Sequence, residues 1–182
     1  EGSIAALNYA HSILMVPQSV VSAALATALF PVLAEMISRG AWREAFRTTL
    51  RWTIVVMFLS LIPVLVMIFW RHELVTLIFE RGAFGRQATE MTSMVVLVLS
   101  FTLLVQGSNA LVMRLLLAQQ QLRLILMTTI LAVIAKVAAN LALVPGFGLE
   151  GVAWATVIAM AIATAARYAG AAWFTRPPAE AT

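Results

Sequence analysis

Long apolar runs separated by short polar segments make up most of the sequence. A helix that crosses a membrane needs about 20 mainly apolar residues, and the polar segments divide the chain into about five runs of that size or longer. The pattern therefore predicts an all-α protein, a polytopic bundle of transmembrane helices. The predicted spans cover residues 3–34, 52–70, 88–118, 124–144 and 152–174.

Proline, glycine and polar residues interrupt this pattern at defined places. Pro17 lies inside the first run and is expected to kink that helix, because proline removes a backbone donor. Residues 72–80 are too polar to cross a membrane and predict a short interfacial helix. The Pro and Gly content of PGFGLEG, residues 145–151, predicts a tight turn. The QGSN segment, residues 106–109, breaks the third run, and residues 177–182 are expected to form a disordered tail.

The composition agrees with a membrane protein. Hydrophobic residues make up 62% of the chain and charged residues 11%, and the mean hydropathy is +0.96; soluble domains usually have about 45–50% and 25%. The net charge is +4, but the cations lie between apolar runs and form no patch with aromatic residues, so we expect no nucleic-acid partner. The absence of cysteine excludes disulfides and thiolate chemistry.

The chain offers little for catalysis. It has no aspartate, and its two histidines, His11 and His72, lie on different segments. No metal-ligand set, nucleophile with its base or phosphate loop is present, so we expect no enzyme activity, no metal and no cofactor. The sequence opens on Glu1 without an initiator Met, which we interpret as a piece of a longer protein.

The arginines predict an orientation. Counted by alternate loops, eight cations fall on one side and three on the other, which favours the first side as cytoplasmic. That side has Arg39, Arg43, Arg47, Arg51, Arg114, Arg123, Arg167 and Arg176, and the other has Arg71, Arg81 and Arg86. The spacing of four from Arg39 to Arg51 predicts a stripe along one side of a helix. With Arg114 and Arg123 this stripe forms the predicted cytoplasmic basic surface.

Four sequence words, in this order, resemble the MurJ/MviN family of lipid II flippases in the MOP superfamily. They are YAHSILMVPQSVVSAALATALFPVLA, LIFERGAF, RLLLAQQQLR and NLALVPGFGLEGVAWAT, and FERGAF is the most distinctive. The resemblance covers residues 3–168 and implies helices eight to twelve of a fourteen-helix transporter. It also implies a bacterial inner (plasma) membrane location, with the N-terminus of this piece outside and its C-terminus cytoplasmic. The arginine count agrees with that orientation.

The resemblance further implies a substrate and partners. The substrate is lipid II or a similar anionic polyprenyl-diphosphate lipid, moved across the membrane by alternating access. The other expected partners are membrane lipids and the missing N-terminal lobe of the same chain. Such a transporter needs a cationic cavity and an apolar groove but no covalent chemistry.

Substrate-path candidates on the first span are His11, Ser12 and Gln18. The family usually carries an arginine in a Tyr-Ala-Asp-Arg word that faces the cavity, and here Ser12 occupies the arginine position and His11 the acidic one. Serine cannot pair with a phosphate at long range as arginine does. His11 is either a proton-dependent cation or an interfacial residue satisfied by water.

Lys136 and Asn140 are the candidates on the fourth span. They lie one helical turn apart and therefore share a face, and the family usually has asparagine at the position of Lys136. An ammonium near the bilayer midplane costs about 2.5–3.5 kcal/mol, so something must offset it. Lys136 lines the cavity, pairs with a carboxylate of the missing lobe, or is neutral and hydrogen-bonded between helices.

Other functions remain open at this point. The departure at Ser12 leaves a transport-inactive scaffold of cell-wall synthesis as the main alternative, beside a flippase for another polyprenyl-diphosphate oligosaccharide. FERGAF and GFGLEG argue against a polysaccharide-precursor flippase and against a drug/sodium antiporter.

Overall fold

The structure, a computed structural model, describes residues 2–79 and 86–175. Within these ranges every regular element is a helix, as the sequence predicts. Most of FERGAF and the predicted tail lie outside the described residues. The helices are α1 (Gly2–Ser38), α2 (Trp42–Phe79), α3 (Arg86–Ala118) and α4 (Leu122–Phe174).

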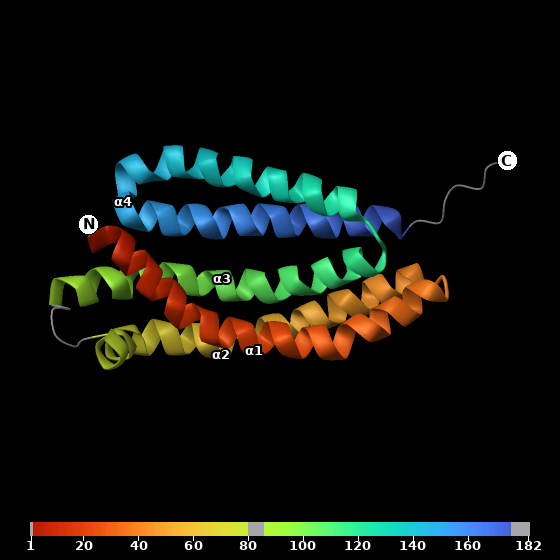
Figure 1. Cartoon of the computed structure of the whole chain (residues 1–182), viewed down its shortest axis with the longest axis horizontal. Coiled ribbons are helices and arrows are strands. Elements are labelled where there is room, and N and C mark those ends of the chain that lie inside the picture. The colour runs from red at the N-terminus through yellow and green to blue at the C-terminus, as the bar shows by residue number, and fades with distance from the viewer. Residues whose placement is uncertain (1, 80–85, 176–182) are drawn as a thin grey trace.

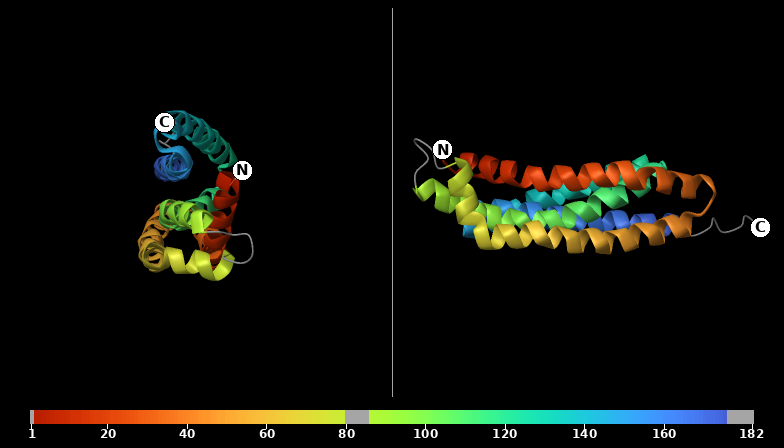
Figure 2. Two further views of the ribbon diagram at one scale, coloured as in Figure 1. Left: turned by 90° about the vertical axis from the view of Figure 1, so that its left-hand side faces the viewer. Right: turned by 90° about the horizontal axis from the view of Figure 1, so that it is seen from below.

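Helix α3 is the centre of the bundle, with α1, α2 and α4 packed around it (Figure 1, Figure 2). One buried apolar cluster joins all four helices, through Val96 of α3, Val64 of α2, Leu14 of α1 and Ala153 of α4. A second joins Leu115 of α3 to Ala171 of α4. In the most apolar stretch of α3, 61% of the residues are buried, against 28% in α2 and 6% in α4. The outer helices therefore present wide apolar faces, as membrane helices do.

Among the described residues, three helices are long and apolar enough to cross a membrane, and α4 contains two of the predicted spans. Its 53 residues are interrupted at Gly148, whose φ of 54° and ψ of −124° are not helical. The chain reverses there, so that α4 forms two segments side by side (Figure 1, Figure 2). We call residues 122–147 the arm and residues 149–174 the return segment. At 1.5 Å per residue each is about 39 Å long, enough to span a bilayer.

Proline and a second kink shape the other helices. Helix α1 continues through Pro17 without a break in its helical backbone, and Figure 1 shows it changing direction in its N-terminal part. Trp70 has non-helical angles (φ −113°, ψ 17°) and divides α2. The short helical piece after Trp70 covers most of the range of the predicted interfacial helix.

Two short connections have the same backbone pattern with different residues. After α1, the Gly40 N–H donates to the Ile37 carbonyl at 3.0 Å, and Gly40 has a φ of 75°. After α3, the Gln120 N–H donates to the Leu117 carbonyl at 3.0 Å, and Gln120 has a φ of 57°. A left-handed residue that ends a helix is usually glycine because a Cβ is strained there. The arm therefore starts from a strained connection.

Candidate functional site

The predicted path residues of α1 lie in the N-terminal half of the helix. His11 and Ser12 are exposed, and Gln18 is half-buried. The Ser12 hydroxyl donates to the Asn8 carbonyl at 2.9 Å. This bond occupies the only proton of the hydroxyl within its own helix, so Ser12 presents lone pairs rather than a donor to its surroundings.

Lys136 and Asn140 lie on the arm, in an apolar setting. Lys136 is exposed, and no carboxylate in the described part of the chain pairs with it. Asn140 is half-buried, and its Oδ1 is buried without a hydrogen-bond partner. Neighbouring apolar side chains are also exposed, Ile134 at 60% and Leu141 at 76%. The arm thus carries one polar stripe on an otherwise lipid-like surface.

The structure does not bring these two groups of candidates together. Helix α1 packs chiefly on α3, and α4 also packs chiefly on α3, with little contact between α1 and α4. Seen end-on, the two segments of α4 lie above the layer formed by α1, α2 and α3 (Figure 2). The two groups of candidates therefore lie on helices that have little contact with each other.

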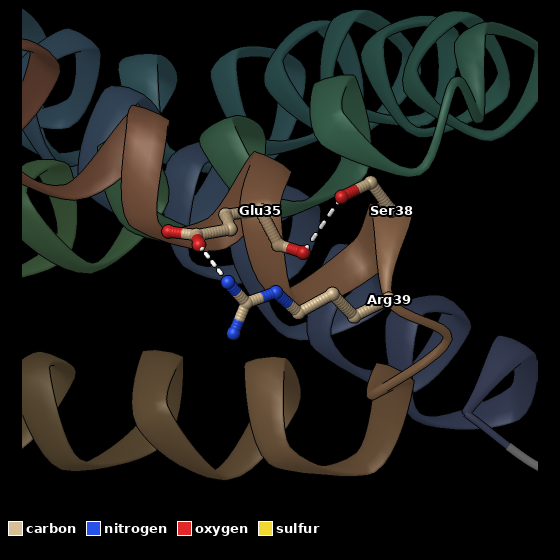
Figure 3. A network of polar contacts seen from close by, with 3 residues as sticks. All are labelled: Glu35, Ser38 and Arg39. Carbon is tan, nitrogen blue, oxygen red and sulfur yellow. Dashed lines mark hydrogen bonds and ion pairs between the residues drawn. The ribbon is translucent and has the colours of Figure 1, made fainter.

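The predicted arginine stripe is only partly correct. Arg43, Arg47 and Arg51 are exposed and helical in α2. Arg39 is not part of that helix, because α1 ends at Ser38 and α2 begins only at Trp42. It reaches back instead and forms an exposed ion pair with Glu35 of α1, beside the bond from the Ser38 hydroxyl to the Glu35 carbonyl (Figure 3).

The remaining two members of the predicted basic surface differ from each other. Arg123 is exposed in the first turn of the arm. Arg114 is half-buried, and its Nε is buried without a partner. Part of the Arg114 side chain therefore lies within the bundle, and its place on a cytoplasmic basic surface stays a prediction.

Arg167 is the largest departure from the predicted arrangement. The charge count grouped it with the loops of the cytoplasmic side, although the predicted span 152–174 contains it. In the structure it lies inside the return segment and is only 7% exposed. Its guanidinium donates from Nε to Thr128 Oγ1 at 3.1 Å and from Nη2 to Thr129 Oγ1 at 3.0 Å, both on the arm. It also donates from Nη1 to Asn109 Oδ1 on α3. We call Arg167 and these three partners the Arg167 cluster.

Tyr168 extends the same junction to α2. Its hydroxyl donates to the Ser108 carbonyl at 3.0 Å and contacts Thr53 Oγ1. Two adjacent residues of the return segment thus hold α2, α3 and the arm together. A close approach supports the junction, because a Cβ on Gly107 would lie only 2.4 Å from Val56 Cγ1.

A signal for this junction was present in the sequence. Arg167 is the one charged residue in the predicted span 152–174, and QGSN is the polar break in another span. Polar groups inside apolar helices satisfy one another across helices, so the two interruptions could have been paired. In the described residues no group of His, Cys, Asp or Glu is arranged to hold a metal ion.

Comparisons with known proteins agree with this architecture. The family described as "Lipid II flippase MurJ" matches residues 1–172 of the chain. A "Probable lipid II flippase MurJ" of Bdellovibrio bacteriovorus is 25% identical over 163 residues, which cover 89% of this chain and 31% of that protein. Another from Rhizobium tropici is 34% identical over 91 residues, covering 50% of this chain and 17% of that protein.

The fold is also found in a solved structure. "Lipid II flippase MurJ, inward closed conformation" superposes with a TM-score of 0.72 at 22% identity, covering 93% of this chain and 36% of that one. The chain thus spans only about a third of the length of that structure and at most 31% of these curated relatives. Because the family match covers nearly the whole chain, the chain belongs to the lipid II flippase MurJ family.

Proposed function

We propose that this chain is part of a lipid II flippase that works by alternating access. The observation that carries the proposal is the polar stripe of Lys136 and Asn140 on a membrane-length, otherwise apolar arm. The names of the relatives, and the inward closed conformation of the structural neighbour, support the same function. In this proposal the protein is a transporter rather than an enzyme.

The physical requirements of the substrate fit the arm. A diphosphate head group needs cations held away from bulk water, and a polyprenyl tail needs an apolar groove. Lys136 supplies a basic side chain near the middle of a membrane-length helix segment. Asn140 has an acceptor oxygen without a partner in the described residues. The exposed side chains of the arm supply apolar surface. We propose that Lys136 and Asn140 line one wall of the path.

The α1 candidates form the opposite wall in this proposal. His11, Ser12 and Gln18 are all accessible at least in part. Ser12 adds no charge, so the cation on this wall is His11 in its protonated form. The substrate head group would then be held between Lys136 on the arm and His11 on α1.

We further propose a multi-pass protein of the bacterial inner membrane, with the start of this chain outside and its end cytoplasmic. Removing the buried Arg167 from the charge count leaves seven cations against three, in favour of the same side. The exposed Arg43, Arg47 and Arg51 then lie against anionic head groups of the cytoplasmic leaflet.

The test is complementation with the full-length protein in cells depleted of their lipid II flippase. The wild type and Lys136→Arg should restore growth, because both keep a cation on the arm. Lys136→Ala should fail, and His11→Ala should fail at low external pH, where the wild-type imidazole is protonated. Full rescue by both alanine variants, at normal protein levels, would contradict the site assignment.

A scaffold of cell-wall synthesis is the second candidate. Ser12 favours it, because this residue stands where the family usually has an arginine and its proton is used within α1. The scaffold predicts that wild-type protein fails to rescue depleted cells even though it is made, inserted and folded. Rescue by the wild type would exclude this alternative.

A further inference from the structure

We propose that Arg167 is a positioning residue that fixes the arm to the bundle and so sets the direction in which Lys136 and Asn140 face. The importance of that direction rests on the proposed function. The attachment itself does not, because it follows from contacts between the described helices. The two parts of the proposal can therefore be tested separately.

The arm buries few side chains of its own, so packing alone leaves its rotation weakly fixed. In the arm, every residue of which the structure describes, Thr128 is the one that is buried. Large side chains from Leu122 to Leu141 are exposed along its length. At its far end the chain turns at Gly148, where neither Gly146 nor Gly148 has an atom within 4 Å of the position of a Cβ. The turn is open at these two glycines, but a Cβ on Gly151 would lie 2.7 Å from the Leu143 carbonyl oxygen, so the two segments approach closely just beyond it. This packing sets the distance between the segments and not the rotation of the arm.

The base of the arm has close contacts with the return segment. A Cβ on Gly170 would lie 2.5 Å from Leu124 Cδ2, so the two segments approach closely there. One turn above, Arg167 donates to Thr128 and Thr129. Close packing sets the distance between the segments, and the directed hydrogen bonds set the rotation of the arm about its own axis.

The two threonine hydroxyls that accept hydrogen bonds from Arg167 have already donated their own protons. The Thr128 hydroxyl donates to the Leu124 carbonyl at 2.9 Å, and the Thr129 hydroxyl donates to the Ile125 carbonyl at 2.7 Å. Each threonine oxygen has thus used its proton and presents lone pairs, which only a donor can satisfy. Arginine has five N–H donors in a rigid plane and can reach three acceptors on two helices at once, whereas lysine cannot match that geometry.

The rotation matters because Thr129, Lys136 and Asn140 share one side of the arm. Their spacings of seven and four residues correspond to about two turns and one turn of helix. The bond from Arg167 to Thr129 therefore aligns one end of the stripe that carries Lys136. If the arm rotated by a third of a turn about its axis, the bond from Arg167 to Thr129 would break and Lys136 would face a different direction.

The attachment can be measured as a distance in the full-length protein. Spin labels at Ile134→Cys on the arm and Phe58→Cys on α2 report the position of the arm by pulsed EPR, and the chain has no cysteine of its own. We expect one narrow distance distribution in the wild type. Arg167→Met should broaden it and remove its main peak, and Thr128→Val with Thr129→Val should do the same while keeping the arginine.

Two controls separate positioning from general damage. Arg123→Met removes an exposed arginine from the same helix and should leave the distance unchanged. The reference pair Phe58→Cys and Met94→Cys spans α2 and α3, and should keep its narrow distribution in Arg167→Met. If the protein is too unstable in Arg167→Met, the threonine pair provides the test, since valine nearly matches threonine in shape.

The outcomes distinguish this inference from the proposed function. An unchanged arm distance in both Arg167→Met and the threonine pair would overturn the positioning role, whatever happens to transport. A broadened distance with normal rescue of depleted cells would keep the attachment and contradict the role of the Lys136 face. If the distance distribution of Arg167→Lys is narrower than that of Arg167→Met but broader than that of the wild type, both the charge and the planar geometry of arginine are needed.

Discussion

Each segment of α4 carries one basic residue within its apolar run, Lys136 in the arm and Arg167 in the return segment, and these two residues lie in opposite settings. Arg167 in the return segment is buried and donates to three neutral oxygens on two other parts of the bundle. Lys136 in the arm is exposed, with no carboxylate partner in the described residues. Both residues interrupt an apolar helix of membrane length, so the sequence pattern around them is similar.

The difference indicates that Arg167 stabilises the fold, whereas Lys136 is available to bind a ligand. Each of the three guanidinium nitrogens of Arg167 donates to a side chain of the protein. Lys136 is exposed and lies on the least packed part of the described helices. A charge inside an apolar helix is a candidate site by default, but the partners decide whether the group binds a ligand or its own protein.

The largest expected difference in stability is between the variants in which Arg167 or Lys136 is replaced by methionine. Arg167→Met should lower the free energy of unfolding by about 2–5 kcal/mol, because three charge-assisted hydrogen bonds are lost and Asn109 loses its partner. Lys136→Met should not lower it, because it removes a charge from an apolar surface. Unfolding of the full-length protein in mixed detergent micelles measures both. Equal losses would contradict the contrast between the two residues.

A smaller difference in stability should follow from adding one methyl group at Gly107, in the junction, or at Gly146, in the turn of α4. Gly107→Ala places a Cβ against Val56 and should cost about 1–3 kcal/mol through overpacking. Gly146→Ala, in the open turn of α4, should be close to neutral. The double variant Gly107→Ala with Val56→Ala should regain much of the loss, as the same unfolding measurement would detect. A loss at Gly146 as large as at Gly107 would contradict the open space at the position of a Gly146 Cβ.

The smallest effect concerns the connection that starts the arm. Gln120→Gly should raise the free energy of unfolding by about 0.5 kcal/mol, since relief of left-handed strain of about 1–2 kcal/mol is offset by the extra entropy of glycine in the unfolded chain. Gly40→Ala, at the matching position after α1, should lower it by about 1–2 kcal/mol. Changes of the same sign in the two variants would contradict the shared backbone pattern.

Much of the fold follows from the sequence because bilayer thickness fixes the length of an apolar helix. The all-helical class and the reversal near Gly148 both follow from apolar run length and from Pro and Gly content. The break at Trp70 carries no Pro or Gly of its own, and the sequence predicted it only through the polar residues that follow. The extent of α1 past its predicted end also required the structure.

The site was less predictable because its contacts are between segments far apart in the chain. Lys136 is conspicuous in the sequence, and its exposed position keeps it a candidate. Arg167 lies near the end of a predicted span, where side chains often reach the head groups, so the charge count included it among the cations of the cytoplasmic side. Only the packing of the return segment against Thr128, Thr129 and Asn109 shows that its charge is used inside the bundle.

The central claim, that the Lys136 face of the arm borders a polar path, is tested most directly by thiol accessibility in the full-length protein within its membrane. Cysteines introduced singly at Lys136 and Asn140 should react with a small water-soluble thiol reagent, and a cysteine at Ile134, on the opposite side of the arm, should not. Equal protection of all three positions, or reaction at Ile134 alone, would contradict the account.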